Sequence, residues 1–169
     1  MTRPEPVQVI KQRRDAVLHA LVEGVPYIAF LGVRFDRLGD ELTAILPYDA
    51  KLIGNPALPA LHGGATASFL EIAAIIELGW ARLWADMESG RLDPAQVQPG
   101  AASLRLPRTI DVTVDYLRAG LPRDAYARAR VNRFGRRYAS VRVDAWQDNR
   151  DRPFAQATGH FMMPQPPRD

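Results

Sequence analysis

The sequence contains no cysteine among its 169 residues. Disulfide bonds, thiolate metal ligands and a cysteine nucleophile are therefore excluded, and the composition fits a cytoplasmic protein. Only three histidines are present, and they are widely spaced: His19, His62 and His160. We therefore expect no metal site, because a bound metal needs several ligands close together.

The sequence also lacks an uninterrupted apolar run as long as a membrane span, and its first residues do not resemble a secretion signal. No membrane partner is therefore expected. Lysine is scarce beside arginine, but the net charge is still +3 and the pI about 9.6. This balance favours an anionic ligand. It is too mild, and the arginines are too scattered, to predict nucleic-acid binding.

The composition predicts a globular protein, since 47% of the residues are hydrophobic and 24% are charged. The length predicts a single domain over residues 1–169. Apolar residues at helical spacing predict an amphipathic helix over residues 5–23, within an N-terminal helical extension of residues 1–26. Residues 164–169 are expected to form a disordered tail.

The extension is followed by a short strand-rich stretch. Residues 27–30 are expected to form a turn, and residues 32–38 and 41–48 two strands of a hairpin. Residues 49–61 contain Gly and Pro in a pattern that predicts an irregular loop.

The most apolar part of the chain is residues 65–80, which predict a helix buried on nearly all sides. The helix is interrupted by only four polar side chains: Thr66, Ser68, Glu71 and Glu77. The stripe that carries Glu71 is otherwise small or apolar, so this carboxylate is expected to be buried or to face a cleft. A carboxylate in such a place needs a partner or a function. Glu77 projects roughly 120° away and is expected to be an ordinary surface acid.

The helix begins directly after His62, Gly63 and Gly64. The first turn of a helix has unpaired N–H groups and the positive end of the helix dipole. Glycine at this place lets a ligand approach the backbone closely. This stretch therefore predicts a site for a phosphate, a carboxylate or a developing oxyanion, with an acid two turns away.

The second half of the chain predicts a sheet. After a long connection over residues 82–107, alternating patterns predict strands over residues 108–117, 125–134, 138–147 and 154–163. The segments 120–124 and 134–137 are expected to be hairpin turns. Short turns imply antiparallel pairing, and a curved sheet can cover the apolar helix, so the fold class is α+β.

These residues resemble a known family. The pattern Asn–x6–His-Gly-Gly–x6–Glu, formed by Asn55, His62 and Glu71, and the strand that begins at Thr109 resemble the hotdog-fold acyl-CoA thioesterases of the PaaI-like (phenylacetate-degradation) group. The resemblance covers residues 32–163. It implies a curved antiparallel sheet wrapped around one central helix.

The resemblance implies a role for each matched residue. The backbone N–H of Gly63, with His62 and Asn55 nearby, would polarise a thioester carbonyl. Glu71 would act as the general base or the nucleophile, and Thr109 would help to orient the water. The remaining substrate contacts would come from Gly64, Ser68, Arg136 and Arg137.

The resemblance also implies partners. The substrate would be an acyl-CoA or acyl-carrier thioester, so that coenzyme A enters with the substrate and no cofactor is needed. The protein would be a homodimer or a dimer of dimers, with sites at the subunit interface. Glu71 and Gly63 of one site would come from opposite subunits.

The residues themselves leave plainer interpretations open. Glu71 can be a structural acid paired with an arginine, and His62 can brace the loop without touching a ligand. Asn55 can be a turn former and Thr109 an ordinary strand residue. Residues 136–137 can be a solvated hairpin tip.

Two other functions also remain open, a non-catalytic acyl-CoA-binding protein and a hotdog dehydratase or hydratase. Dehydratases need a His shortly before a loop like residues 54–59. Lys51 and Leu52 stand there instead.

Overall fold

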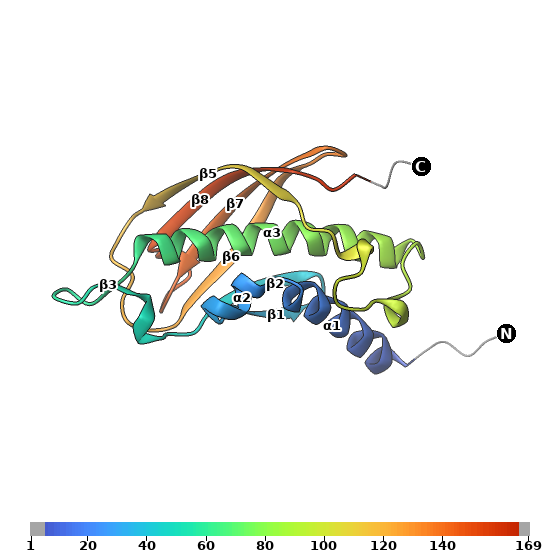
Figure 1. Ribbon diagram of the computed structural model, residues 1–169, viewed down its shortest axis with the longest axis horizontal. Helices are drawn as coiled ribbons and strands as arrows, with labels where there is room; N and C mark the ends of the chain where they lie inside the picture. The colour runs from blue at the N-terminus through green and yellow to red at the C-terminus, as the bar shows by residue number, and fades with distance from the viewer. Residues whose placement is uncertain (1–5, 166–169) are drawn as a thin grey trace.

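A computed structural model describes residues 6–165 (Figure 1). Its helices are α1 (Val7–Glu23), α2 (Pro26–Leu31) and α3 (Gly63–Glu88), with 3₁₀ turns at Ala50–Leu52, Pro94–Gln96 and Ala102–Leu104. Its strands are β1 (Arg34–Leu38), β2 (Glu41–Leu46), β3 (Ile53–Asn55), β4 (Ala60–Leu61), β5 (Arg108–Tyr116), β6 (Ala125–Phe134), β7 (Tyr138–Trp146) and β8 (Ala155–Met162). Six strands form one antiparallel sheet in the order β1-β2-β6-β7-β8-β5.

The sheet curves around α3, as Figure 1 shows. The strand faces toward the helix carry small or β-branched side chains, such as Ala127, Val141 and Val143, which are fully or almost fully buried. Helix α3 fills this concave face with Phe69 and Trp80, both fully buried. Small strand residues let the sheet approach a helix that carries large side chains. The α+β class, with one central apolar helix and an extra N-terminal helix, is therefore confirmed.

Helix α3 has the length and apolar composition of a membrane-spanning helix. Within residues 6–165 it is the one helix long and apolar enough to cross a membrane, with an 18-residue stretch of mean hydropathy 1.3. The helix reaches this average although polar side chains, Glu71 and Glu77 among them, interrupt its apolar run. Since 56% of this stretch is buried inside the protein, its apolar surface is satisfied by the sheet, as in the core helix of a soluble domain.

Two segments are more regular than expected. Residues 27–30 belong to the short helix α2, whose first residue is Pro26 and which ends at Gly32 in the left-handed conformation (φ 76°). The expected irregular loop contains a 3₁₀ turn and the two-stranded ribbon β3–β4. Proline at the first helical position and glycine just after the last one are the usual boundaries of a helix, so α2 could have been predicted.

The segment 120–124 is not a hairpin turn, which corrects the sequence prediction. Strand β5 pairs with β8 at the edge of the sheet, whereas β6 lies between β2 and β7. The chain therefore crosses over between the two strands. Alternating patterns identify strands but not their neighbours, and this crossover makes β5 an edge strand.

The long connection after residue 82 is largely ordered. Helix α3 continues to Glu88, and Gly90 and Gly100 turn the chain with positive φ angles of 70° and 80°. The last part returns across α3 at Gly79, where an added Cβ would lie 3.0 Å from Leu106 Cδ2. The connection therefore covers the C-terminal half of the helix.

Most of the expected tail, residues 166–169, lies outside the described part of the chain. Gln165 is described, and its side-chain amide donates to the carbonyl of Arg136 at 2.9 Å.

Glu77 is not the surface acid that the sequence predicted. It is mostly buried on the side of α3 that faces the sheet, and burial, followed by the charges of Asp40 and Glu41, raises its pKa to about 7, while Arg128 lowers it. The sheet covers this side of α3. Because Glu77 projects from a different side of the helix than Glu71, its side chain meets the sheet instead of the solvent.

This burial predicts how stability depends on pH. The folded-state pKa of about 7 lies above the ordinary glutamate value of 4.5, so the folded protein binds the proton more tightly than the unfolded chain. The free energy of unfolding should therefore fall as pH rises from 4.5 through about 7, by at most about 3 kcal/mol. Glu77→Gln, measured by urea unfolding at several pH values, should lose this dependence and be more stable than the native protein at pH 8. The exposed acid Glu23 is the control, since Glu23→Gln should keep the native profile; an unchanged profile in Glu77→Gln would contradict the assignment.

Candidate active site

The start of α3 is held by His62. This residue is the N-cap, and its ring Nδ1 accepts a hydrogen bond from the backbone N–H of Gly64 at 2.9 Å. Its own N–H donates to the carbonyl of Leu52 at 2.7 Å. Gly54 passes so close that an added Cβ would lie 2.7 Å from His62 Cα. His62 therefore braces the helix start, and the N–H of Gly64 is already used.

The backbone N–H of Gly63 is the donor that stays available at the helix start. As the first residue of α3, its N–H has no acceptor within the helix, and no other residue among 6–165 accepts from it. Its carbonyl accepts a hydrogen bond from the Tyr116 hydroxyl at 2.7 Å, and the Tyr116 ring lies against Gly63. Tyr116 was not foreseen as a site residue, although its place on the same alternating face as Val112 and Val114 was a usable signal.

Glu71 and Thr109 meet between α3 and β5. The Thr109 hydroxyl donates to Glu71 Oε1 at 2.5 Å, and Glu71 is half-buried. The pairing of β5 with β8 shifts register between Thr109 and Asp111, which re-aims side chains at this point of the strand. Among residues 6–165 no arginine pairs with Glu71, so the plainer interpretation as a structural ion pair does not apply.

Ser68 lies one turn before Glu71 and contacts α2. Its hydroxyl lies 3.2 Å from the Tyr27 hydroxyl. Tyr27 stacks on Phe30 with 5.9 Å between ring centroids, and Lys51 Nζ bonds to the Phe30 carbonyl at 2.8 Å. Tyr27 was assigned to a plain turn by the sequence, because nothing in its spacing shows that α2 packs on the start of α3.

These contacts define the surroundings of Glu71. Gly64, Glu71 and Ile75 follow each other along one exposed or half-buried stripe of α3. Helix α2 flanks this stripe at Ser68, and strand β5 flanks it at Glu71. We call this stripe, with its two flanks, the α3 groove.

Asn55 lies apart from the groove, on the β3–β4 ribbon. Its side-chain oxygen accepts from the N–H groups of Ala57 and Leu58 at 3.1 and 3.4 Å, which is an Asx turn. The sequence interpretation of Asn55 as a turn former describes this geometry. In Figure 1 the ribbon projects beyond the start of α3.

Arg136 and Arg137 stand at the β6–β7 hairpin tip, at the same end of the sheet as Thr109. Thr109 pairs with Phe161, and Phe161 pairs with Ala139 close to the tip. The three Cα atoms of this row therefore span roughly 10 Å. Neither guanidinium has a hydrogen bond or ion pair with another group among residues 6–165.

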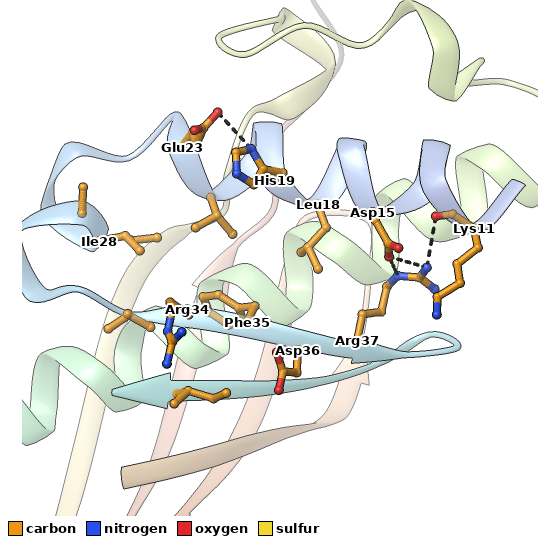
Figure 2. A pocket seen from close by; sticks show the side chains of 14 residues that line it. Lys11, Asp15, Leu18, His19, Glu23, Ile28, Arg34, Phe35, Asp36 and Arg37 are labelled. Atoms are coloured by element: carbon orange, nitrogen blue, oxygen red, sulfur yellow. Dashed lines mark hydrogen bonds and ion pairs between the residues drawn. The ribbon is translucent and has the colours of Figure 1, made fainter. Parts of the chain in front are cut away.

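A cavity of about 720 Å³ lies elsewhere, between α1, α2 and β1. Figure 2 shows α1 on one side and β1 on the other, with Arg37 bound to Asp15 and His19 to Glu23. None of the expected site residues lines it. Within residues 6–165 no group of three His, Cys, Asp or Glu side chains could hold a metal ion; the absence of a cofactor stays a prediction.

A long helix in a curved antiparallel sheet, with glycines at the helix start and an acid two turns later, is the plan of the hotdog thioesterases. The sequence model of the thioesterase superfamily matches residues 58–154, and the chain belongs to this family. The resemblance drawn from the sequence is thereby confirmed.

Individual proteins similar to this chain are consistent with this family. The chain is 28% identical over 161 residues to the medium/long-chain acyl-CoA thioesterase YigI of Escherichia coli, covering 93% of this chain and 97% of that protein. A Chromobacterium violaceum protein of known structure is 30% identical, with a TM-score of 0.61 over 94% of this chain and 98% of its own. A phenylacetic acid degradation-related protein of Ralstonia eutropha, a thioesterase by its description, has a TM-score of 0.62 at 19% identity over 87% of this chain and 99% of its own.

The close approach at Gly54 yields a prediction. In Gly54→Ala the new Cβ would meet the backbone of His62 at 2.7 Å, so the loop must shift, and we expect a loss of about 1–3 kcal/mol of stability. Thermal unfolding measures this. Gly24→Ala is the matched control, because the nearest atoms to its Cβ would be 3.5 Å away and its φ is −64°; it should be neutral or slightly stabilising. Equal stability of the two variants would refute the tight contact.

Proposed function

We propose that the protein hydrolyses acyl-CoA thioesters, with Glu71 as the general base and the N–H of Gly63 as the oxyanion donor. The observation that carries this proposal is the half-buried carboxylate of Glu71, held by the Thr109 hydroxyl in the α3 groove. The acyl-CoA substrate is also that of the E. coli relative by its name.

The chemistry follows from the two groups. The Thr109 hydroxyl donates a hydrogen bond to Oε1 of Glu71, so Oε2 is the oxygen that can take a proton. Oε2 takes this proton from a water molecule while the water oxygen attacks the thioester carbon. Negative charge then develops on the carbonyl oxygen, where a fixed backbone N–H is worth about 3 kcal/mol. When the C–S bond breaks, the proton on Glu71 passes to the departing thiolate.

One chain cannot present both groups to one thioester. Gly63 and Glu71 are eight residues apart in α3, which corresponds to roughly 12 Å along the helix axis. In the proposed reaction the N–H of Gly63 must reach the carbonyl oxygen, and Glu71 must reach the water that attacks the same carbonyl carbon. This spacing supports the proposal that Glu71 of one subunit faces Gly63 of a second copy.

The edge strand β5 is the surface we propose for this pairing. Among residues 6–165 no strand pairs with its outer side, and Ile110 and Tyr116 on it are 52% and 55% exposed. Unpaired strand edges with exposed apolar side chains favour pairing with another strand. Since β5 also carries Thr109, a dimer across this edge would bring two α3 grooves together. A further pairing into tetramers stays a prediction.

The other residues that the sequence singled out have supporting roles in the proposed reaction. The guanidinium groups of Arg136 and Arg137, which pair with no other group among residues 6–165, suit the phosphates of coenzyme A. Ser68 and Gly64 would line the substrate path, and His62 would position Gly63 by capping the helix. The geometry supports Asn55 in shaping the ribbon more than in binding the carbonyl. A cytoplasmic location stays a prediction.

The test is thiol release from a panel of acyl-CoA esters. Glu71→Gln removes the base but keeps the shape and the hydrogen bond from Thr109, so kcat should fall by about 10²–10⁴-fold while binding of the ester is kept. Glu88→Gln, at the exposed end of the same helix, is the control and should retain full activity. Turnover unchanged in Glu71→Gln rules this residue out as the base, and no release by the native protein leaves the binding-only alternative.

The dimer proposal has its own prediction. Ile110→Lys places a charge on the free edge of β5, a substitution that natural edge strands use against pairing. We expect a monomer by light scattering, loss of most activity and an unchanged circular dichroism spectrum. Leu38→Lys is the control, because Leu38 is 79% exposed on the opposite edge strand β1; it should remain dimeric and active. A fully active Ile110→Lys monomer would overturn the shared site.

A further inference from the structure

The cavity of about 720 Å³ between α1, α2 and β1 runs along the free edge of β1, at the opposite end of the sheet from β5. We call it the β1 groove. Four consecutive strand residues, 34–37, line it. Successive side chains of a strand point to opposite faces of the sheet, so a cavity above one face would touch only alternate residues. The β1 groove therefore borders the edge of the strand itself.

Helix α1 forms the opposite wall of the groove, as Figure 2 shows. The residues of α1 that line it share one helix face: Lys11, Asp15, Leu18, His19, Val22 and Glu23. Between the two walls the lining is apolar, with Ile28 and Val33 buried and Phe35 half-buried. The groove thus lies between a helix face and a strand edge, over an apolar lining.

The backbone of β1 is unpaired on its outer side. Among residues 6–165 only β2 pairs with β1, and no other backbone group of that part bonds to residues 34–38. The N–H and C=O groups of such an edge can pair with a further extended chain. The four strand residues in the lining span roughly 13 Å, which matches a segment of about four residues.

The charges in the groove favour an acidic residue in such a segment. Two pairs of lining residues already bond to each other: Arg37 with Asp15, and His19 with Glu23. The ammonium of Lys11, the guanidinium of Arg34 and the carboxylate of Asp36 bond to no other group among residues 6–165. Two free cations against one free acid give the groove an excess of positive charge, which attracts a carboxylate.

A second copy of this chain suits the edge less well than a single segment. Arg37 donates to Asp15 at 2.8 Å and to the carbonyl of Lys11 at 3.4 Å, so α1 is held beside the strand. Two β1 strands paired about their middle residue would also place Asp36 opposite Asp36, and like charges in direct opposition are destabilising. One extended segment avoids both problems.

We propose that the β1 groove binds an extended peptide segment of a partner protein, which adds to β1 as a further strand. Its apolar side chains face Phe35 and α1, and an acidic side chain on its other face lies beside Arg34, because neighbouring strand residues point to opposite faces. The proposed dimer uses β5 at the opposite edge, so the β1 groove stays open in it.

The test selects peptides from a random library displayed on phage, with the native protein as bait. Fluorescence anisotropy then measures the Kd of each enriched peptide. We expect apolar residues to alternate with polar ones, with an acid among the polar ones. Ala29→Trp fills the groove from an exposed position on α2 and should raise the Kd at least tenfold. The matched control is Ala119→Trp, since Ala119 is exposed and does not line the groove; it should leave the Kd unchanged.

A second variant keeps the test valid if Ala29→Trp folds poorly. Arg34→Glu should weaken the acidic peptides at least tenfold and should prefer versions that carry lysine in place of the acid.

Methylation of the peptide backbone separates strand addition from binding to an apolar surface. Every second N–H of an added strand points toward β1, so N-methyl groups on one set of alternate residues should abolish binding, whereas the other set should be tolerated. Equal effects of the two sets overturn the proposal. So does a library without enriched sequences, or peptides that bind the native protein and both groove variants equally. Tetramers by light scattering that disappear in Ala29→Trp would instead assign the edge to a second copy.

Discussion

The structure depends on the burial of one long apolar helix inside one curved sheet. Helix α3 has large side chains such as Phe69 and Trp80 on the sheet side, and the strands supply alanine and valine against them. Hydrophobic burial of this size drives the fold. The sheet covers most of the helix but leaves a single stripe open, and the groups assigned to the reaction lie along it. Packing and function are therefore divided between two faces of the same helix.

Strand β5, from the second half of the chain, lies beside the open stripe of α3 and contacts the groups assigned to the reaction. Strand β5 places Thr109 against Glu71 and Tyr116 against Gly63, so one edge strand contacts both ends of the α3 groove. The axial separation of these two ends exceeds what one carbonyl group can span. In the proposed dimer, each subunit would contribute one of these groups to a site, across the edge strand β5.

The other side of the groove belongs to the segments outside the sheet. Helix α2 contacts Ser68, and residues 103–106 cross the helix at Gly79, held by Arg82. These segments contribute little to the sheet core, but they cover parts of α3 that the sheet does not.

The sequence by itself determined most of the elements and the family. Periodicity placed α1, the start of α3 and the six strands of the sheet near their observed bounds, because hydrophobic spacing directly reflects which side of an element is buried. It missed the last two turns of α3 and the β3–β4 ribbon. The spacing of His62, Gly63 and Glu71 located the helix start and the acid.

Only the tertiary structure decided which elements are neighbours. Strand order made β5 an edge strand and turned an expected hairpin into a crossover. Long-range packing placed Tyr27 on Ser68 and buried Glu77, which local patterns had assigned to a turn and to the surface. The physical reason is the same in each case: periodicity records that a side chain is buried, whereas the identity of the partner depends on contacts between segments far apart in the chain.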